Sequence, residues 1–201
     1  MSKNSIDVTA IGNAIVDVLA QCDDEFLKEN NITKSSMNLI DEDRSKFLFD
    51  NINSPTVVSG GSAANTAVGL ASLGSTAAFI GKVKNDELGN TFKRDIKEVG
   101  VSFDTALNEN GPRTASSTIL ITPDAERSMN TFLGACVNLD DQDIDESLIK
   151  KSKLVYLEGY LFDPPQAKDA FRKAAKVAKD ENNLVAITLS DSFCVERHRD
   201  D

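Results

Sequence analysis

Short apolar runs of strand type alternate with helical runs along most of the chain. The strand-type runs lie at 7–11, 56–58, 76–80, 154–158 and 184–189, and helical patterns occupy 62–73, 86–99 and 164–182 between them. The last run, LVAITL, is apolar throughout, which is typical of a strand buried on both faces of a parallel sheet. The alternation predicts a doubly wound α/β sheet.

A second group of strands does not fit this alternation. Residues 15–20, 36–40 and 114–132 carry polar and apolar residues in turn, and Pro123 and Asp124 mark a hairpin inside the last segment. These strands predict a small separate sheet beside the main one. Helices are also expected at 23–30, after a cap at Asp41, and weakly at 141–150.

Charge and cysteine content exclude several classes of protein. The 201 residues carry a formal charge of −10, so nucleic acid and anionic membranes are not expected partners. Three widely spaced cysteines form neither a disulfide framework nor a metal quartet, which favours a reducing, cytoplasmic location. The first residues show no export signal, and no apolar stretch approaches the ~20 residues that a membrane span needs.

A glycine pair separates a strand from a helix in the segment VVSGGSAANTAVGLASL at 57–73. Gly60 and Gly61 permit a sharp turn and close approach of a ligand, and the helix that follows offers free backbone N–H groups. Asn65, one turn in, carries an amide that can both donate and accept. A tight turn with small residues for packing explains the segment equally well. The segment is neither a P-loop nor a GxGxxG motif.

Asp17 lies among valines in the middle of an apolar strand. Burial of a lone carboxylate is costly unless something pairs with it, so a ligand is one explanation. The alternative is that Asp17 points to solvent from an edge strand.

Taken together, these motifs resemble those of one enzyme family. GNAIVD at 12–17, followed by the run from Val57 to Gly89 with its GG, Asn, LG and GxVxxDxxG pattern, resembles the ribokinase-like (PfkB) family of carbohydrate and nucleoside kinases. Residues 12–32 and ERSMNTFLGA at 126–135 are most similar to adenosine kinase and its bacterial sugar and nucleoside kinase relatives. The resemblance covers essentially the whole chain.

The resemblance implies a ribokinase-like fold, with a small β lid that accounts for the extra strands, and it implies site residues by position. Asp17 would hold ribose hydroxyls beside Asn13, and Gly60, Gly61 and Asn65 would complete the grip on the sugar. The residues expected near the nucleobase side of the lid are Met37 to Leu39 and Phe132. Arg127 would reach a phosphate, although a solvated hairpin arginine is an equal alternative.

Two family motifs are absent from residues 1–201. The GAGD motif, whose Asp is the catalytic base, and the Asn-x-x-Glu motif that organises Mg²⁺ do not occur where the family has them. The sequence therefore resembles the N-terminal two-thirds of a kinase, with the base expected beyond residue 201 and ATP and Mg²⁺ implied only by the resemblance. A chain ending at Asp201 is expected to expose a sheet edge and to be marginal or oligomeric.

The expected function is transfer of the ATP γ-phosphoryl group to a nucleoside or sugar hydroxyl, in the first place the adenosine 5′-hydroxyl. The alternatives are a ribose- or fructose-type sugar kinase and a non-catalytic nucleoside- or sugar-binding protein, and the chain alone is expected to be inactive. A monomer and a lid-mediated homodimer are both consistent with the family.

Other polar residues carry weaker signals. His198 lies in a charged tail, and the acidic residues at 140–146 lack the spacing of a calcium loop. Glu158 ends a strand at the edge where α/β sheets bind ligands, and it is either part of the site or a satisfied buried carboxylate. Cys136 is expected to be packing, and no metal site is predicted in the chain.

Overall fold

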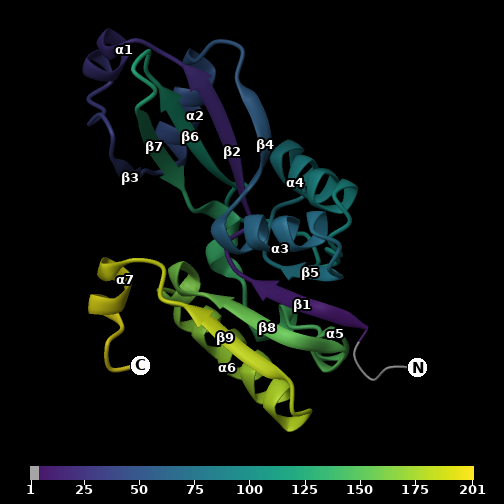
Figure 1. Cartoon of the computed structure of the whole chain (residues 1–201). Coiled ribbons are helices and arrows are strands. Elements are labelled where there is room, and N and C mark those ends of the chain that lie inside the picture. Colours follow the sequence, from purple (N-terminus) through teal and green to yellow (C-terminus); the bar gives the residue numbers. More distant parts are fainter. Residues whose placement is uncertain (1–4) are drawn as a thin grey trace.

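The computed structural model describes residues 5–201, which form two sheets joined at a narrow junction (Figure 1). The main sheet contains four parallel strands in the order β5 (Ala77–Ile80), β1 (Ile6–Ile11), β8 (Ser152–Glu158) and β9 (Leu184–Thr188). Together with its helices it confirms the predicted α/β fold class.

The second sheet holds the strands that broke the alternation, and one more. Its order is β3 (Met37–Leu39), β7 (Arg127–Phe132), β6 (Ala115–Ile121), β2 (Ile15–Gln21) and β4 (Thr56–Gly60). The sequence did not indicate that β4 belongs here, because its pairing partner is β2, some forty residues earlier, with which it runs antiparallel.

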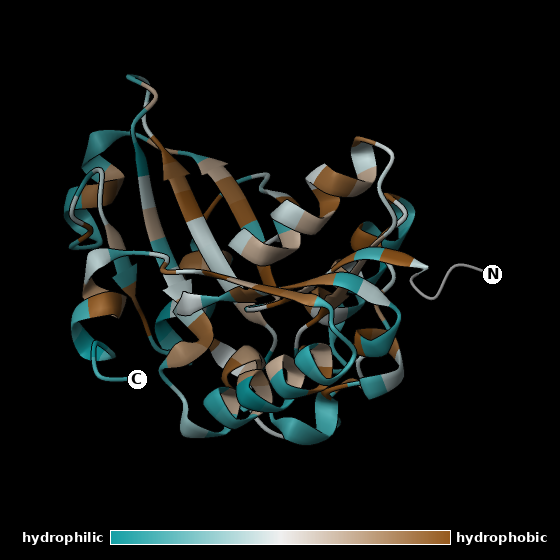
Figure 2. Cartoon of the chain, turned by 60° about the horizontal axis from the view of Figure 1, so that its bottom comes forward, coloured by the Kyte–Doolittle hydropathy of each residue, from teal (hydrophilic) through white to brown (hydrophobic). Residues whose placement is uncertain are grey.

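Helices cover one face of the small sheet and both faces of the main sheet. Short α1 (Asp24–Glu29) and α2 (Glu42–Asn51) pack on the small sheet through Leu27, Leu48 and Leu120. Helix α3 (Ser62–Ser72) and helix α4 (Glu87–Glu98) enclose a core with Phe79, Phe92 and Phe103 at the junction, and α6 (Pro165–Asp180) covers the other face of the main sheet. Hydrophobic residues gather on the strands and hydrophilic ones on the outward turns of the helices (Figure 2).

Local capping explains where the helices start. The side chains of Asp23, Asp41 and Asp86 each accept a hydrogen bond from a backbone N–H in the first turn of the helix that follows. The single helix predicted over 141–150 is wrong. Asp140 closes a capping box on a short 3₁₀ turn, Asp141–Asp143, and Asp145 caps a separate helix, α5 (Glu146–Lys150).

Strand β9 is not buried on both faces as its composition suggested. It forms the edge of the main sheet, and Leu184, Ile187 and Leu189 are exposed because no described strand pairs with its outer side. Helix α7 (Ser192–Arg197) follows it and packs against Phe162 through His198, whose Nε2 lies 2.6 Å from Asp163. None of the helices among residues 5–201 is long and apolar enough to cross a membrane.

Candidate functional site

Asp17 lies in the second strand from the edge of the small sheet. Its strand, β2, pairs with β4 on one side and β6 on the other, so the edge-strand alternative is wrong. Register places one residue of each strand in a single cross-strand row, and the row reads Leu39, Thr131, Ser117, Asp17 and Val58. The hydroxyls of Ser117 and Thr131 are hydrogen-bonded to each other at 2.9 Å.

The Asp17 carboxylate is half-buried and unpartnered. Within the described part of the chain no side chain or backbone group forms a hydrogen bond or ion pair with it, and burial raises its pKa to about 6. Its oxygens lie against Gly60, because a Cβ added there would approach Oδ2 closer than 3.0 Å. A carboxylate in this state has its acceptor sites free for the hydroxyls of a ligand.

The two glycines at the start of α3 are required by their contacts. Gly60 leaves room for the Asp17 carboxylate, and Gly61 has a φ of +96°. A Cβ on Gly61 would also approach the Asn13 carbonyl oxygen closer than 3.0 Å. The turn therefore brings the backbone of Asn13 and the start of α3 into direct contact.

Asn13 and Asn65 differ in exposure. The Asn13 residue is buried, and its backbone N–H donates to Glu158 Oε2 at 2.5 Å. Asn65 is exposed in the first turn of α3, where its backbone N–H donates to the Gly61 carbonyl and its side chain forms no hydrogen bond with any other described residue. Glu158, which the sequence left undecided, is the buried group that meets the Asn13 turn.

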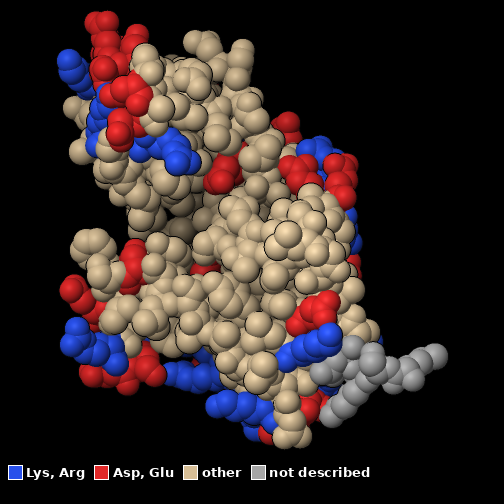
Figure 3. Space-filling view, viewed as in Figure 1, with Lys and Arg blue, Asp and Glu red and all other residues tan. Residues whose placement is uncertain are grey.

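The open face of the small sheet is apolar beyond Asp17. A second cross-strand row reads Met37, Met129, Ile119, Leu19 and Thr56. Met37 is 52% exposed and Leu39, in the Asp17 row, is 62% exposed, although both are large apolar residues. The hollow in Figure 3 lies between the small sheet and the main sheet.

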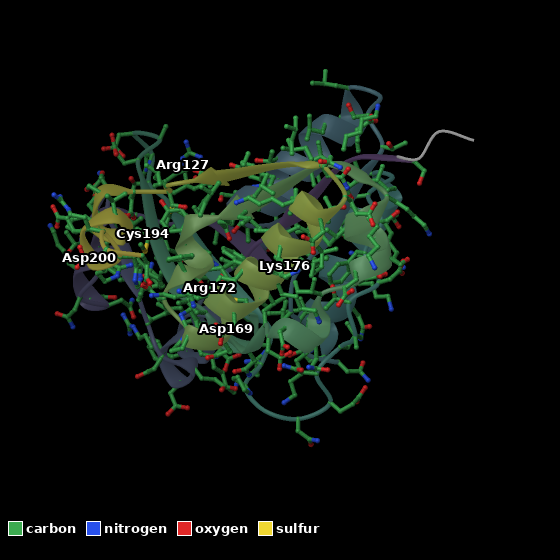
Figure 4. The ribbon with its side chains drawn as sticks, turned by 90° about the horizontal axis from the view of Figure 1, so that it is seen from below. Arg127, Asp169, Arg172, Lys176, Cys194 and Asp200 are labelled. Carbon is green, nitrogen blue, oxygen red and sulfur yellow. The ribbon has the colours of Figure 1, made fainter. Side chains whose placement is uncertain are left out.

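Two of the predicted site residues, Phe132 and Arg127, do not lie beside Asp17 on the open face of the small sheet. Phe132 pairs with Ser116, whose hydroxyl contacts Ser45 of α2, so its side chain is on the helix-covered face, opposite to Asp17. Arg127, labelled in Figure 4, shares the open face with Met129 but is exposed at the far end of β7. It makes no ion pair with any described residue.

No sequence pattern pointed to the hydroxyl pair of Ser117 and Thr131 or to Ser62, which donates to Glu158 Oε1. Serines and threonines are frequent in strands and turns, so only the strand register places Ser117 and Thr131 beside Asp17, and only the folded chain brings Ser62 to Glu158. A separate cavity of about 300 Å³ lies between β9 and α7, lined among others by Phe162, Ile187 and Leu189, and none of the predicted site residues borders it.

The described residues do not provide a site for a metal ion or for nucleotide phosphates. No group of three or more His, Cys, Asp or Glu side chains among residues 5–201 is arranged to hold a metal. Arg127, the phosphate contact expected from the sequence, is exposed at the far end of β7, four positions along the sheet from the row that holds Asp17. ATP and Mg²⁺ therefore do not fit the residues present.

The fold and this site together define the class of protein. Residues 34–197 match the family model described as pfkB family carbohydrate kinase, and the chain belongs to that family. It is 53% identical to the adenosine kinase from Sinorhizobium meliloti, with a TM-score of 0.87 over 96% of this chain and 59% of that one. It is 47% identical to a probable sugar kinase from Rhizobium etli CFN 42, with a TM-score of 0.89 over 98% of this chain and 60% of that one.

Similarity extends to curated sugar kinases. The chain is 35% identical to probable fructokinase-6, chloroplastic, of Arabidopsis thaliana over 129 residues, which are 63% of this chain and 34% of that protein. The chain thus spans about a third of the length of this curated relative and about 60% of the solved structures. The proteins to which it is similar are small-molecule kinases, and they include both nucleoside and sugar kinases.

Proposed function

We propose that the chain binds adenosine and is the substrate-binding part of a kinase that phosphorylates the nucleoside 5′-hydroxyl. The observation that carries the proposal is the free, half-buried Asp17 carboxylate in one row with exposed apolar side chains. A carboxylate can accept one hydrogen bond from each hydroxyl of a vicinal diol, as ribose provides.

The apolar part of the open face favours a nucleoside over a monosaccharide. Met129 lies on β7, two strands from Asp17, which is about 10 Å at the usual strand spacing. A ribose on Asp17 with a base extending across β6 toward Met37 and Met129 covers this distance. A monosaccharide would leave the apolar row in water, and burying that row is favourable.

In this proposal the chain's own residues bind and orient the substrate. Asp17 accepts from the ribose hydroxyls, Asn65 offers its free amide from α3, and the Gly60–Gly61 turn lets the sugar approach the backbone. Met37 and Leu39 exclude water from the base. The residues that would hold ATP and Mg²⁺ and the base that would accept the hydroxyl proton are proposed to lie outside residues 1–201.

The similarity to the Sinorhizobium meliloti adenosine kinase supports this reading, and the similarity to a fructokinase and a probable sugar kinase supports the alternative of a sugar acceptor. The alternative predicts that the apolar row plays no part in binding. A binding protein without turnover is the third possibility, and it shares the same site.

Calorimetric titration with adenosine, ribose and fructose tests the proposal. We expect adenosine to bind at least tenfold more tightly than ribose, and Met37→Ala to weaken adenosine but not ribose. Ribose or fructose binding as tightly as adenosine would instead favour the sugar kinase. Adenosine-dependent ADP formation by this chain is not expected, and its appearance would show that the base lies within residues 1–201.

A further inference from the structure

The Glu158 carboxylate sits at the point where the two sheets meet. Glu158 ends β8, is 1% exposed and forms no ion pair with any described Lys, Arg or His. A buried carboxylate without a cation needs hydrogen-bond donors to offset its lost hydration. Three donors surround it, and they come from two segments that lie 96 and 145 residues away in the sequence.

Each carboxylate oxygen binds a different segment. Oε2 accepts from the backbone N–H of Asn13 at 2.5 Å, in the turn that leads into β2. Oε1 accepts from the Ser62 hydroxyl and from the backbone N–H of Ala63 at 3.2 Å, in the first turn of α3. One side chain thus ties both substrate-facing segments to the main sheet.

The packing around this carboxylate leaves no space. A Cβ on Gly12 would come within 2.5 Å of Glu158 Oε2 and 2.7 Å of the Ala63 Cβ. Gly12 therefore permits the close approach of the β1–β2 turn, and the carboxylate fixes the position of that turn. Asp17 follows four residues after Asn13, and Asn65 follows two residues after Ala63.

We propose that Glu158 is a positioning residue for substrate binding: it sets the spacing between the Asn13–Asp17 segment and the Gly61–Asn65 segment without itself contacting the ligand. Three of the roughly four acceptor positions of its carboxylate are occupied by the chain. This inference rests on the proposed function, since it assumes that both segments face one ligand.

Glu158→Gln tests this directly, because the side chain keeps its size and shape while one acceptor oxygen becomes an NH₂ donor. Whichever way the amide is turned, its NH₂ group faces a backbone N–H, that of Asn13 or that of Ala63, which has then lost its acceptor. Glu158→Asp keeps both acceptors on a shorter side chain. Ser152→Ala is the matched control, because Ser152 is also buried in β8 and hydrogen-bonded, to Thr9 at 2.7 Å, at the other end of the strand.

The experiment combines adenosine titration with amide hydrogen exchange of the ligand-free chain. We expect Glu158→Gln to weaken adenosine binding at least tenfold and to speed exchange at Asn13 and Ala63, with Glu158→Asp in between. Ser152→Ala should lower the melting temperature but leave the affinity and those two amides unchanged.

The outcomes separate the two levels of the proposal. If wild type fails to bind adenosine, the proposed function is wrong. Faster exchange at Asn13 and Ala63 in Glu158→Gln would still support the claim that Glu158 holds these two segments in place. If wild type binds and Glu158→Gln binds equally well while remaining folded, the positioning role is overturned. An equal loss of affinity in Ser152→Ala would reduce Glu158 to a general contribution to stability, and this too would overturn the proposal.

Discussion

At the scale of single residues, the candidate site contains two carboxylates that form no ion pair with any described residue, Asp17 and Glu158. The Asp17 carboxylate has no partner among residues 5–201, whereas Glu158 has three donors and no cation. The sequence could identify Asp17, because a lone charge in an apolar strand is visible locally. It could not decide on Glu158, because the donors that satisfy it lie far away along the chain.

Adenosine affinity is expected to fall as the pH drops through about 6, where Asp17 gains a proton in the free protein. A protonated carboxyl offers fewer acceptor sites to the two ribose hydroxyls. Titration between pH 5 and 8 measures this, and Asp17→Asn should bind weakly with a flat profile. A wild-type affinity that is constant over this range would contradict the role given to Asp17.

Asp17 also affects stability in a defined direction. Its pKa in the folded chain is about 6, above the ordinary value of 3.8, so its contribution to folding is fully present below pH 3.8 and is lost as the pH rises through 6. Asp17→Asn should therefore stabilise the ligand-free chain at pH 7, by about 1 kcal/mol once solvent screening of a half-buried group is allowed for. Denaturant unfolding at pH 7 and pH 5 checks this, and the gain should shrink at pH 5.

Gly61→Ala, at the N-cap of α3, and Gly69→Ala, inside the same helix, form a matched pair. Gly61 has a φ of +96° and faces the Asn13 carbonyl, while Gly69 lies inside α3 with nothing within 4 Å of its Cβ position. We expect Gly61→Ala to cost about 2 kcal/mol or more and Gly69→Ala to add about 0.5–1 kcal/mol. Urea unfolding gives both values, and a tolerated Gly61→Ala would mean that the turn is not constrained as described.

At the scale of elements, the strands and capped helices were predictable from local pattern, but their partners were not. The position of β4 in the small sheet depends on pairing with β2, and the exposure of β9 depends on the absence of a neighbour. The apolar composition of β9 alone predicts a central strand, whereas the structure places it at the edge of the main sheet. The split of 141–150 into a 3₁₀ turn and α5 was missed because two aspartates five residues apart, Asp140 and Asp145, each start a new turn.

The 201-residue chain is expected to self-associate through β9, because an apolar edge strand with open backbone groups is a template for pairing. Leu184, 69% exposed at the start of β9, is the natural site for a charge. Leu184→Lys should lower the weight-average mass measured by sedimentation equilibrium. Leu73→Lys, at an exposed site outside the sheets, should leave it unchanged. A lid-mediated dimer would respond to neither change.

At the scale of the whole molecule, the sequence indicated two sheets but not how they meet. The meeting point is made of contacts between segments far apart in the chain, such as the one between Glu158 and Ser62. Charge on the outside is arranged as local pairs, as on α6, where Arg172 and Asp169 lie 3.2 Å apart and Lys176 pairs with Asp180 (Figure 4). Such exposed pairs contribute little to stability.

Adenosine is expected to raise the stability of the whole chain, because a ligand that binds only the folded state adds about 2.7 kcal/mol at a hundred times its dissociation constant. A thermal melt with and without adenosine measures the shift, and ribose at the same concentration serves as the control. Equal shifts with both ligands would argue against any part for the apolar row.

Glycines at the junction have a mechanical consequence. Gly12, Gly61, Gly81 and Gly134 each lie so close to a neighbouring group that a Cβ would come nearer than 3.0 Å. Because these residues have no side chains, the segments at the junction between the two sheets pack closely. The seven-residue strand β6 extends about 20 Å away from this junction. A rotation of a few degrees at the glycines would therefore be magnified to a displacement of an ångström or more at the rim that carries Met37 and Arg127.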